Sequence, residues 1–432
     1  MRTLAPSSPR DRFEVYRFFN GLSSEAKEGL DQRRTRVPLV KTFLLEHVAC
    51  RGNGRPKPPA HIFENLGAEI RPIDDRFMGL NFEVSDPDAV TRLRATTGFL
   101  EQYDERFFAY YTCEDSAEAK KRVAKWVQAP DLDYTWFSSP LLQVLWDKDV
   151  SKRGDERFGK LVFRHESIFD MPEDFSSPEE TPEETASEDV TEEATDDEEG
   201  ITEERLEVER RKARFEMGDR IGRIKGALSK LQENYDPLYA LHALRLPSRM
   251  GRGGHDLYQA GQITNRTDSF EDHRNTVRYL YRIYKAILES TEKSAWSEIS
   301  STQAFPHVGL KGVPLVVKFS ESLSKATFNR WVQKAFQKRN RFKLWGDPIR
   351  LGPTKVHVYG ADRHLWQPIN LEMTAEGVVA ILPQGTCGNT FHRLLTNIQH
   401  YICPKIHAWV GAESFEDIVR KWPDNAEEPN ED

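Results

Sequence analysis

The feature that most constrains this 432-residue chain is an acidic run over residues 173–204. The run contains sixteen aspartate and glutamate side chains, no lysine or arginine, and two prolines. Its charges repel one another, and its few apolar side chains bury too little surface to offset the entropy lost on ordering. We therefore expect a disordered acidic linker that separates two globular α/β-type halves.

The sequence on both sides of the linker has the composition of folded protein, and its length suits two to three domains. We predict an N-terminal α/β domain at 1–172 and a helical segment at 205–300. A C-terminal α+β domain at 311–422, with a mostly antiparallel sheet covered by helices, is followed by an acidic tail at 423–432. The expected fold class is α+β.

Apolar spacing predicts helices in two places. Near the N-terminus, the apolar residues are Leu39, Val40, Phe43, Leu44 and Val48, which fits a helix better than a strand. After the linker, a heptad-like seam is formed by Met217, Ile221, Ile224, Leu228, Leu231 and Tyr235. Glycines at 218, 222 and 226 adjoin this seam and favour close approach of another helix. Helix 217–235 is thus a candidate coiled-coil contact for a protein partner.

Charge is distributed unevenly along the chain. Residues 205–422 carry 34 basic and 21 acidic side chains, whereas the linker contributes sixteen negative charges and the tail five. A basic half with two acidic strings suits a polyanionic partner for which the strings compete. The alternative is that the acidic strings keep a basic domain soluble.

Three groups of cationic residues are candidates for contacts with phosphate. A glycine-rich loop carries Arg249, Arg252 and His255; a helix stripe carries Arg274, Arg278, Arg282 and Lys285; a second stripe carries Arg330, Lys334 and Lys338. Glycines let backbone amides approach an anion, and regularly spaced cations can follow a phosphate backbone. The alternative for each group is a solvated surface.

A possible anion loop lies between a predicted strand and a predicted helix. It contains Gly385, Cys387 and Gly388, and Arg393 follows on the helix. Free amides at a helix N-terminus attract anions and would lower the pKa of Cys387. The alternative is a tight turn that holds the helix against the sheet.

Other ligands are not indicated by the sequence. Cysteines and histidines are concentrated at Cys387, His392, His400, Cys403 and His407, but their spacing matches no common zinc pattern. We therefore expect no metal and no cofactor. The chain also lacks an apolar run long enough to span a bilayer, so no membrane partner is expected. The four cysteines show no paired framework, which favours a cytoplasmic location.

Three classes of function remain open. The leading hypothesis is a cytoplasmic nucleic-acid-associated binding or accessory protein, which binds DNA or RNA with its basic C-terminal half and is autoinhibited by the acidic linker and tail. The second is a protein–protein adaptor in a larger complex. The third is an enzyme that acts on a phosphate or nucleotide at the Cys387 loop.

Overall fold

The protein is an α+β fold built on two largely antiparallel sheets, as the sequence predicts. This computed structural model describes residues 9–32, 39–47, 62–64, 66–82, 97–129, 131–171, 213–301, 308–338, 340–364 and 366–421. The predicted acidic linker and acidic tail lie outside these described residues. The helices that the structure describes are α1 (Arg12–Asp31), α4 (Ser116–Trp126), α5 (Ser139–Leu145), α7 (Ile221–Gln232), α8 (Phe270–Ala295), α9 (Lys325–Ala335), α10 (Asn389–Tyr401) and α11 (Phe415–Arg420), with short helices η1 (Trp146–Val150), η2 (Ser151–Arg153) and η3 (Asp236–Tyr239).

The first sheet combines strands from before and after the acidic run. Its order is β2 (Ala68–Pro72), β3 (Phe77–Phe82), β4 (Thr97–Gln102), β5 (Phe107–Thr112), β1 (Lys41–His47), β11 (Gln262–Asn265), β10 (Gly254–Tyr258), β9 (Leu241–Pro247), β7 (Phe158–His165) and β8 (Ala213–Arg220), with β6 (Leu132–Tyr134) also paired to β1. Helices cover both faces, since Leu44 of β1 packs in the core shared with α1 and α8, and Phe43 packs in a second core with α4.

The acidic run is therefore an insertion within the first sheet. Strand β7 pairs with β8 along its whole length, and His165 at the end of β7 lies opposite Ala213 at the start of β8. Strand β7 also pairs with β9. The predicted domain boundary at 173–204 is thus not where the structure divides, because hydrogen bonds between neighbouring strands join the two sides of the run. The division between the sheets follows α8 instead.

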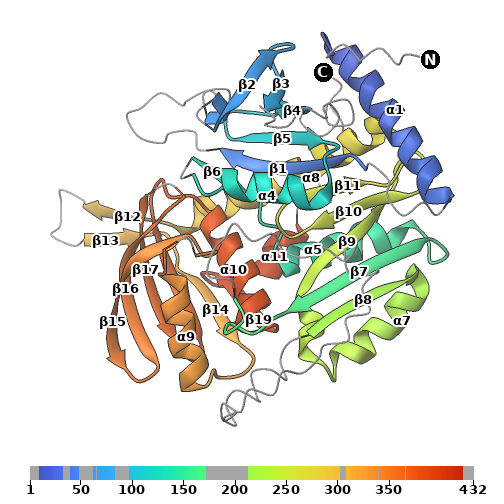
Figure 1. Cartoon of the computed structure of the whole chain (residues 1–432). Coiled ribbons are helices and arrows are strands. Elements are labelled where there is room, and N and C mark those ends of the chain that lie inside the picture. Colours follow the sequence, from blue (N-terminus) through green and yellow to red (C-terminus); the bar gives the residue numbers. More distant parts are fainter. Residues whose placement is uncertain are drawn as a thin grey trace, which may run out of the picture.

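The second sheet is built from strands that lie after α8, most of them within residues 311–422. Its order is β15 (Leu344–Gly352), β16 (Lys355–Asp362), β17 (Gln367–Thr374), β18 (Gly377–Pro383), β14 (Leu315–Phe319), β19 (Ile406–Val410) and β20 (Glu413–Ser414), and β12 (Trp296–Ser301) pairs with β13 (Val308–Lys311) and with β18. Helices α10 and α11 lie between this sheet and strands of the first sheet (Figure 1). One hydrophobic core runs continuously between the two sheets.

One predicted helix is a strand, and a region predicted to be helical is partly built of strands. Residues 41–47 form β1, which is buried on both faces and so lacks the polar alternation of a half-exposed strand. The region 205–300, predicted to be helical, contains β8–β11 as well as α7 and α8. Met217 lies in β8, and the helical seam begins only at Ile221.

Part of the seam packs inside the protein, whereas Leu231 and Tyr235 are exposed and Gly226 faces open space. Ile221, Ile224 and Leu228 are buried in the main core, so this face of α7 is not open to a partner helix. A Cβ atom at residue 222 would come within 2.9 Å of the Cβ atom of Asp155. Gly222 thus permits close packing against the segment before β7, where the sequence predicted a neighbouring helix.

The described helices include none with the length and apolarity needed to cross a bilayer.

Candidate anion-binding site

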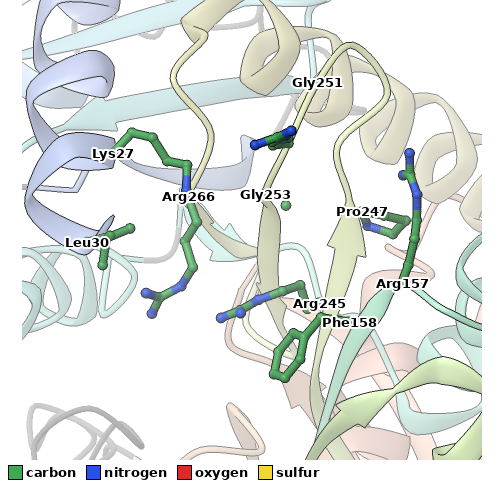
Figure 2. Close-up of a pocket in the computed structure, with 11 residues that line it drawn as sticks. Lys27, Leu30, Arg157, Phe158, Arg245, Pro247, Gly251, Gly253 and Arg266 are labelled. Atoms are coloured by element: carbon green, nitrogen blue, oxygen red, sulfur yellow. The ribbon is translucent and has the colours of Figure 1, made fainter. Parts of the chain in front are cut away.

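A cationic pocket opens beside the hairpin of β9 and β10. Its volume is about 430 Å³. It is lined by Lys27, Leu30, Arg157, Phe158, Arg245, Pro247, Gly251, Arg252, Gly253, Gly254 and Arg266. Figure 2 shows Arg245 and Arg266 directed into the space between α1 and the hairpin. Five of the lining side chains are cationic, and none carries a carboxylate.

The hairpin loop is held in place by its glycines and by the start of α8. Gly253 has a φ of +93°, which disfavours other residues, and a Cβ atom at residue 254 would overlap the carbonyl oxygen of Leu246. The Oγ atom of Ser248 accepts a hydrogen bond from the Gly251 amide at 2.8 Å and donates one to Asp272 at 2.7 Å. The glycines are therefore required by the backbone geometry of the hairpin.

Two arginines in the pocket share one carboxylate. Arg245 donates hydrogen bonds of 2.6 and 2.9 Å to Asp256, and Arg266 donates one of 2.5 Å to the same side chain. Burial alone would lower the pKa of Arg245, but Asp256 outweighs it and raises that pKa. Burial lowers the pKa of Arg266 despite its contact with Asp256. Asp256 is thus a shared partner that holds both guanidinium groups at the pocket.

The other three cations of the pocket, Arg157, Arg252 and Lys27, have weak interactions or none with described acidic side chains. Arg157 donates a hydrogen bond of 3.3 Å to the Ser248 carbonyl, and Arg252 is exposed. Neither arginine forms an ion pair with any residue that the structure describes. Lys27 pairs with Asp31 at 2.7 Å, and the Asp31 side chain is 64% exposed, so this pair contributes little. The pocket is thus lined by five cationic side chains, and among the described residues only Arg245, Arg266 and Lys27 of these five form ion pairs.

The structure separates the residues of the predicted cationic loop. Arg252 lines the pocket, as expected for an anion-binding residue. Arg249 instead lies 3.8 Å from the ring centre of Tyr279 and 3.9 Å from Asp149. His255 is fully buried, and burial lowers its pKa to about 4. A buried neutral imidazole cannot contact a phosphate group, so this loop contributes Arg252 to the site.

Much of the predicted stripe on α8 is engaged within the protein. Arg274 donates hydrogen bonds of 2.9 and 3.0 Å to Glu101 of β4. Lys285 pairs at 2.6 Å with Asp104, in the turn between β4 and β5. Arg278 and Arg282 are half-buried. The stripe therefore joins α8 to the β4–β5 hairpin and lies apart from the pocket.

The predicted stripe on α9 is not continuous. Lys334 is buried, and its ammonium group donates a hydrogen bond of 3.0 Å to the Met171 carbonyl. Arg330 donates to Gln333 at 3.1 Å, and Lys338 is exposed. Because α9 covers the second sheet and α8 the first, the structure does not bring the two stripes into one surface.

The predicted anion loop before α10 already holds an internal anion. Glu292, near the end of α8, accepts a hydrogen bond of 2.8 Å from the Gly388 amide. Burial and the nearby Glu46 raise the pKa of the Cys387 thiol well above its usual range, so the expected lowering is wrong. Arg393 is directed to Asp133 and Asp362. Gly385 occupies a turn with φ of +87°. The loop docks α10 onto α8.

Sequence reasoning found one of the five pocket cations. Arg245 lies within the mostly buried strand β9, Arg266 follows β11, and Arg157 precedes β7, far away in the sequence. Pairing of β9 with both β7 and β10 brings these segments together. Arginines within or next to otherwise apolar strands are the signal that could have identified the site.

Comparisons with known proteins identify a family for the two-sheet fold. The model of the family described as MJECL33-like protein matches residues 10–416, so this chain belongs to that family. The chain is 28% identical over 144 residues to a protein of Methanocaldococcus jannaschii named uncharacterized protein MJECL33. The match covers 33% of this chain and 33% of that protein, so the chain matches about a third of its relative's length. No solved structure matched the chain.

Proposed function

We propose that this protein binds nucleic acid and that the cationic pocket receives a phosphate group of the backbone. The observation that carries the proposal is a concave site lined by five cationic and no acidic side chains, two of which, Arg157 and Arg252, form no ion pair with described residues. Guanidinium groups bind phosphate oxygens with paired hydrogen bonds, and release of counterions favours such contacts. A pocket of about 430 Å³ has room for a phosphate and its sugar.

The place of the acidic run in the chain is compatible with competition for the pocket. The run is inserted after the far end of β7, whose near end begins at Phe158 in the pocket wall. Strand β7 has eight residues, which at ~3.3 Å each corresponds to a length of roughly 26 Å. Half of the 32-residue run can extend about 50 Å. The acidic run is thus long enough to reach the pocket, as the proposed autoinhibition requires.

Binding of fluorescent DNA and RNA oligonucleotides to the full chain tests the proposal. We expect the double variant Arg157→Gln with Arg252→Gln to bind at least tenfold more weakly than the wild type at low salt. The matched control, Arg223→Gln with Arg350→Gln, removes two exposed arginines that do not line the pocket. Equal loss of affinity in both double variants, or no binding by the wild type, would contradict the proposal.

Neutralising the acidic run tests the autoinhibition separately. Replacing Glu192, Glu193, Asp196 and Asp197 by their amides in the full chain should strengthen oligonucleotide binding several-fold, because a tethered competitor acts at high effective concentration. The same variant should show unchanged thermal unfolding. An unchanged dissociation constant would remove the competitive role of the run and leave the pocket proposal standing.

A second candidate function, a protein–protein adaptor, is favoured by the outer face of the second sheet. Trp345 is 59% exposed, Ile349 60% and Tyr359 73%. They lie on β15 and β16, and β15 is an edge strand among the described strands. Contiguous exposed apolar groups mark interaction surfaces. If this is the main function, the pocket variants will leave the protein's complexes intact, and Ile349→Ser with Tyr359→Ser will disrupt them.

A further inference from the structure

We propose that Glu46, His364 and Cys387 bind a divalent zinc-type cation that clamps the two sheets together. One carboxylate oxygen, one imidazole nitrogen and the thiol sulfur all lie within 4.8 Å of one another. All three residues are buried, with exposed fractions of 4% or less. An oxygen, a nitrogen and a sulfur ligand form a combination that zinc accepts.

The distances at this cluster suit a tetrahedral ion. The Glu46 Oε1 and Cys387 Sγ atoms are 3.2 Å apart, and the Glu46 Oε2 and His364 Nε2 atoms are 3.8 Å apart. Bonds of ~2.0–2.3 Å to zinc place tetrahedral ligands about 3.3–3.5 Å from one another. Small side-chain movements would therefore allow all three residues to coordinate one ion.

A carboxylate oxygen of the cluster has no hydrogen-bond partner among the described residues. The Glu46 Oε1 atom accepts from Arg106 at 2.5 Å and from the Cys387 thiol at 3.2 Å, but the Oε2 atom accepts no hydrogen bond from the described residues. A buried carboxylate oxygen without a partner is unfavourable. This oxygen faces His364, on the side of the cluster where the cation would sit.

The charges around the cluster also favour a dication. Arg106 donates to Glu46, to Glu292 at 3.1 and 2.6 Å, and to the Cys387 sulfur at 3.3 Å. Two buried carboxylates thus share one guanidinium group, which leaves one negative charge. A bound thiolate adds a second, and a divalent ion neutralises both. Arg106 would remain as the partner that orients Glu46 and Cys387.

The three proposed ligands come from both sheets. Glu46 lies in β1 of the first sheet, whereas His364 follows β16 and Cys387 precedes α10 in the second half. They are separated in sequence by as many as 341 residues. This separation explains why the spacing of cysteines and histidines led us to expect no metal.

Metal analysis and Co²⁺ titration of the full chain, purified without a metal-affinity step, test the proposal. We expect about one zinc per wild-type chain, a rise in Tm with Zn²⁺, and a thiolate-to-Co²⁺ absorption band. The band should vanish in Cys387→Ala and persist in Cys403→Ala, because Cys403 is buried elsewhere and donates to the Lys405 carbonyl.

Two results would overturn the proposal. One is wild-type protein that contains no zinc and binds neither Zn²⁺ nor Co²⁺ at micromolar concentration. The other is a Co²⁺ band that survives in folded Cys387→Ala. Because the wild-type titration does not depend on any substitution, it decides the matter even if Cys387→Ala fails to fold.

Discussion

Substitution of Arg393 by alanine should lower the free energy of unfolding by about 3–5 kcal/mol, enough to prevent folding at 37 °C. The Arg393 side chain is fully buried in α10 and forms ion pairs with Asp133 and Asp362. It also donates a hydrogen bond of 2.9 Å to the Phe342 carbonyl. Its removal leaves two buried carboxylates with Lys343, 3.4 Å from Asp133, as the remaining cation. Urea denaturation monitored by tryptophan fluorescence measures the loss.

Arg350→Ala is the matched control for this prediction. Arg350 is an exposed arginine of β15 that donates a hydrogen bond of 3.0 Å to Asn329. An exposed contact of this kind contributes at most about 1 kcal/mol. If Arg393→Ala is no more destabilised than Arg350→Ala, then the buried ion pairs do not hold α10 to the first sheet.

Mild acid should destabilise the protein through buried histidines, three of which lie outside the proposed metal cluster. Burial lowers the pKa of His255 to about 4, that of His392 to about 3, and that of His273 well below its usual value. The folded chain keeps these rings neutral while the unfolded chain protonates them near pH 6.5. Their contribution to stability is therefore full above pH 6.5 and falls below it, by ~1.4 kcal/mol per pH unit for each histidine. Raised pKa values of Glu46 and Glu114 offset part of this loss.

Urea denaturation at pH 7.5 and pH 5.5 checks this prediction. His392 packs among the rings of Tyr284, Phe391 and Phe415, and neither ring nitrogen has a hydrogen-bond partner among described residues. His392→Phe should therefore be tolerated and should flatten the pH dependence by one proton. His407→Asn, at an exposed position, should leave it unchanged. A pH dependence that is the same in wild type and His392→Phe would refute the assignment.

The sequence predicts strands well where one face of the strand is exposed. Strand β16 alternates buried Val356 and Val358 with exposed His357 and Tyr359, and its position was predicted correctly. Strand β1 is buried throughout, so its apolar residues carry no period of two and resemble a helix. Strand β8 is mostly exposed at a sheet edge. Its Met217 lies four residues before Ile221, so it continues the apolar spacing of the helix that follows.

The sequence also predicts only part of each candidate site. Arg252 was found because its loop combines glycine and arginine within a few residues. Arg157, Arg245 and Arg266 join it through strand pairing, which sequence spacing does not reveal. The sequence also did not predict which cationic side chains are exposed. Lys334 has the spacing of a surface cation, yet it is buried and donates a hydrogen bond to the Met171 carbonyl.

The salt dependence of oligonucleotide binding tests the central claim most directly. Each phosphate contact on duplex DNA contributes about 0.9 to the slope of log K against log salt concentration. Arg157→Gln with Arg252→Gln should therefore reduce the slope of the wild type by about 1.8 while leaving its Tm unchanged, whereas Arg223→Gln with Arg350→Gln should retain the wild-type slope. A slope that is identical in the wild type and the pocket variant would show that nucleic acid, if bound, does not contact the pocket.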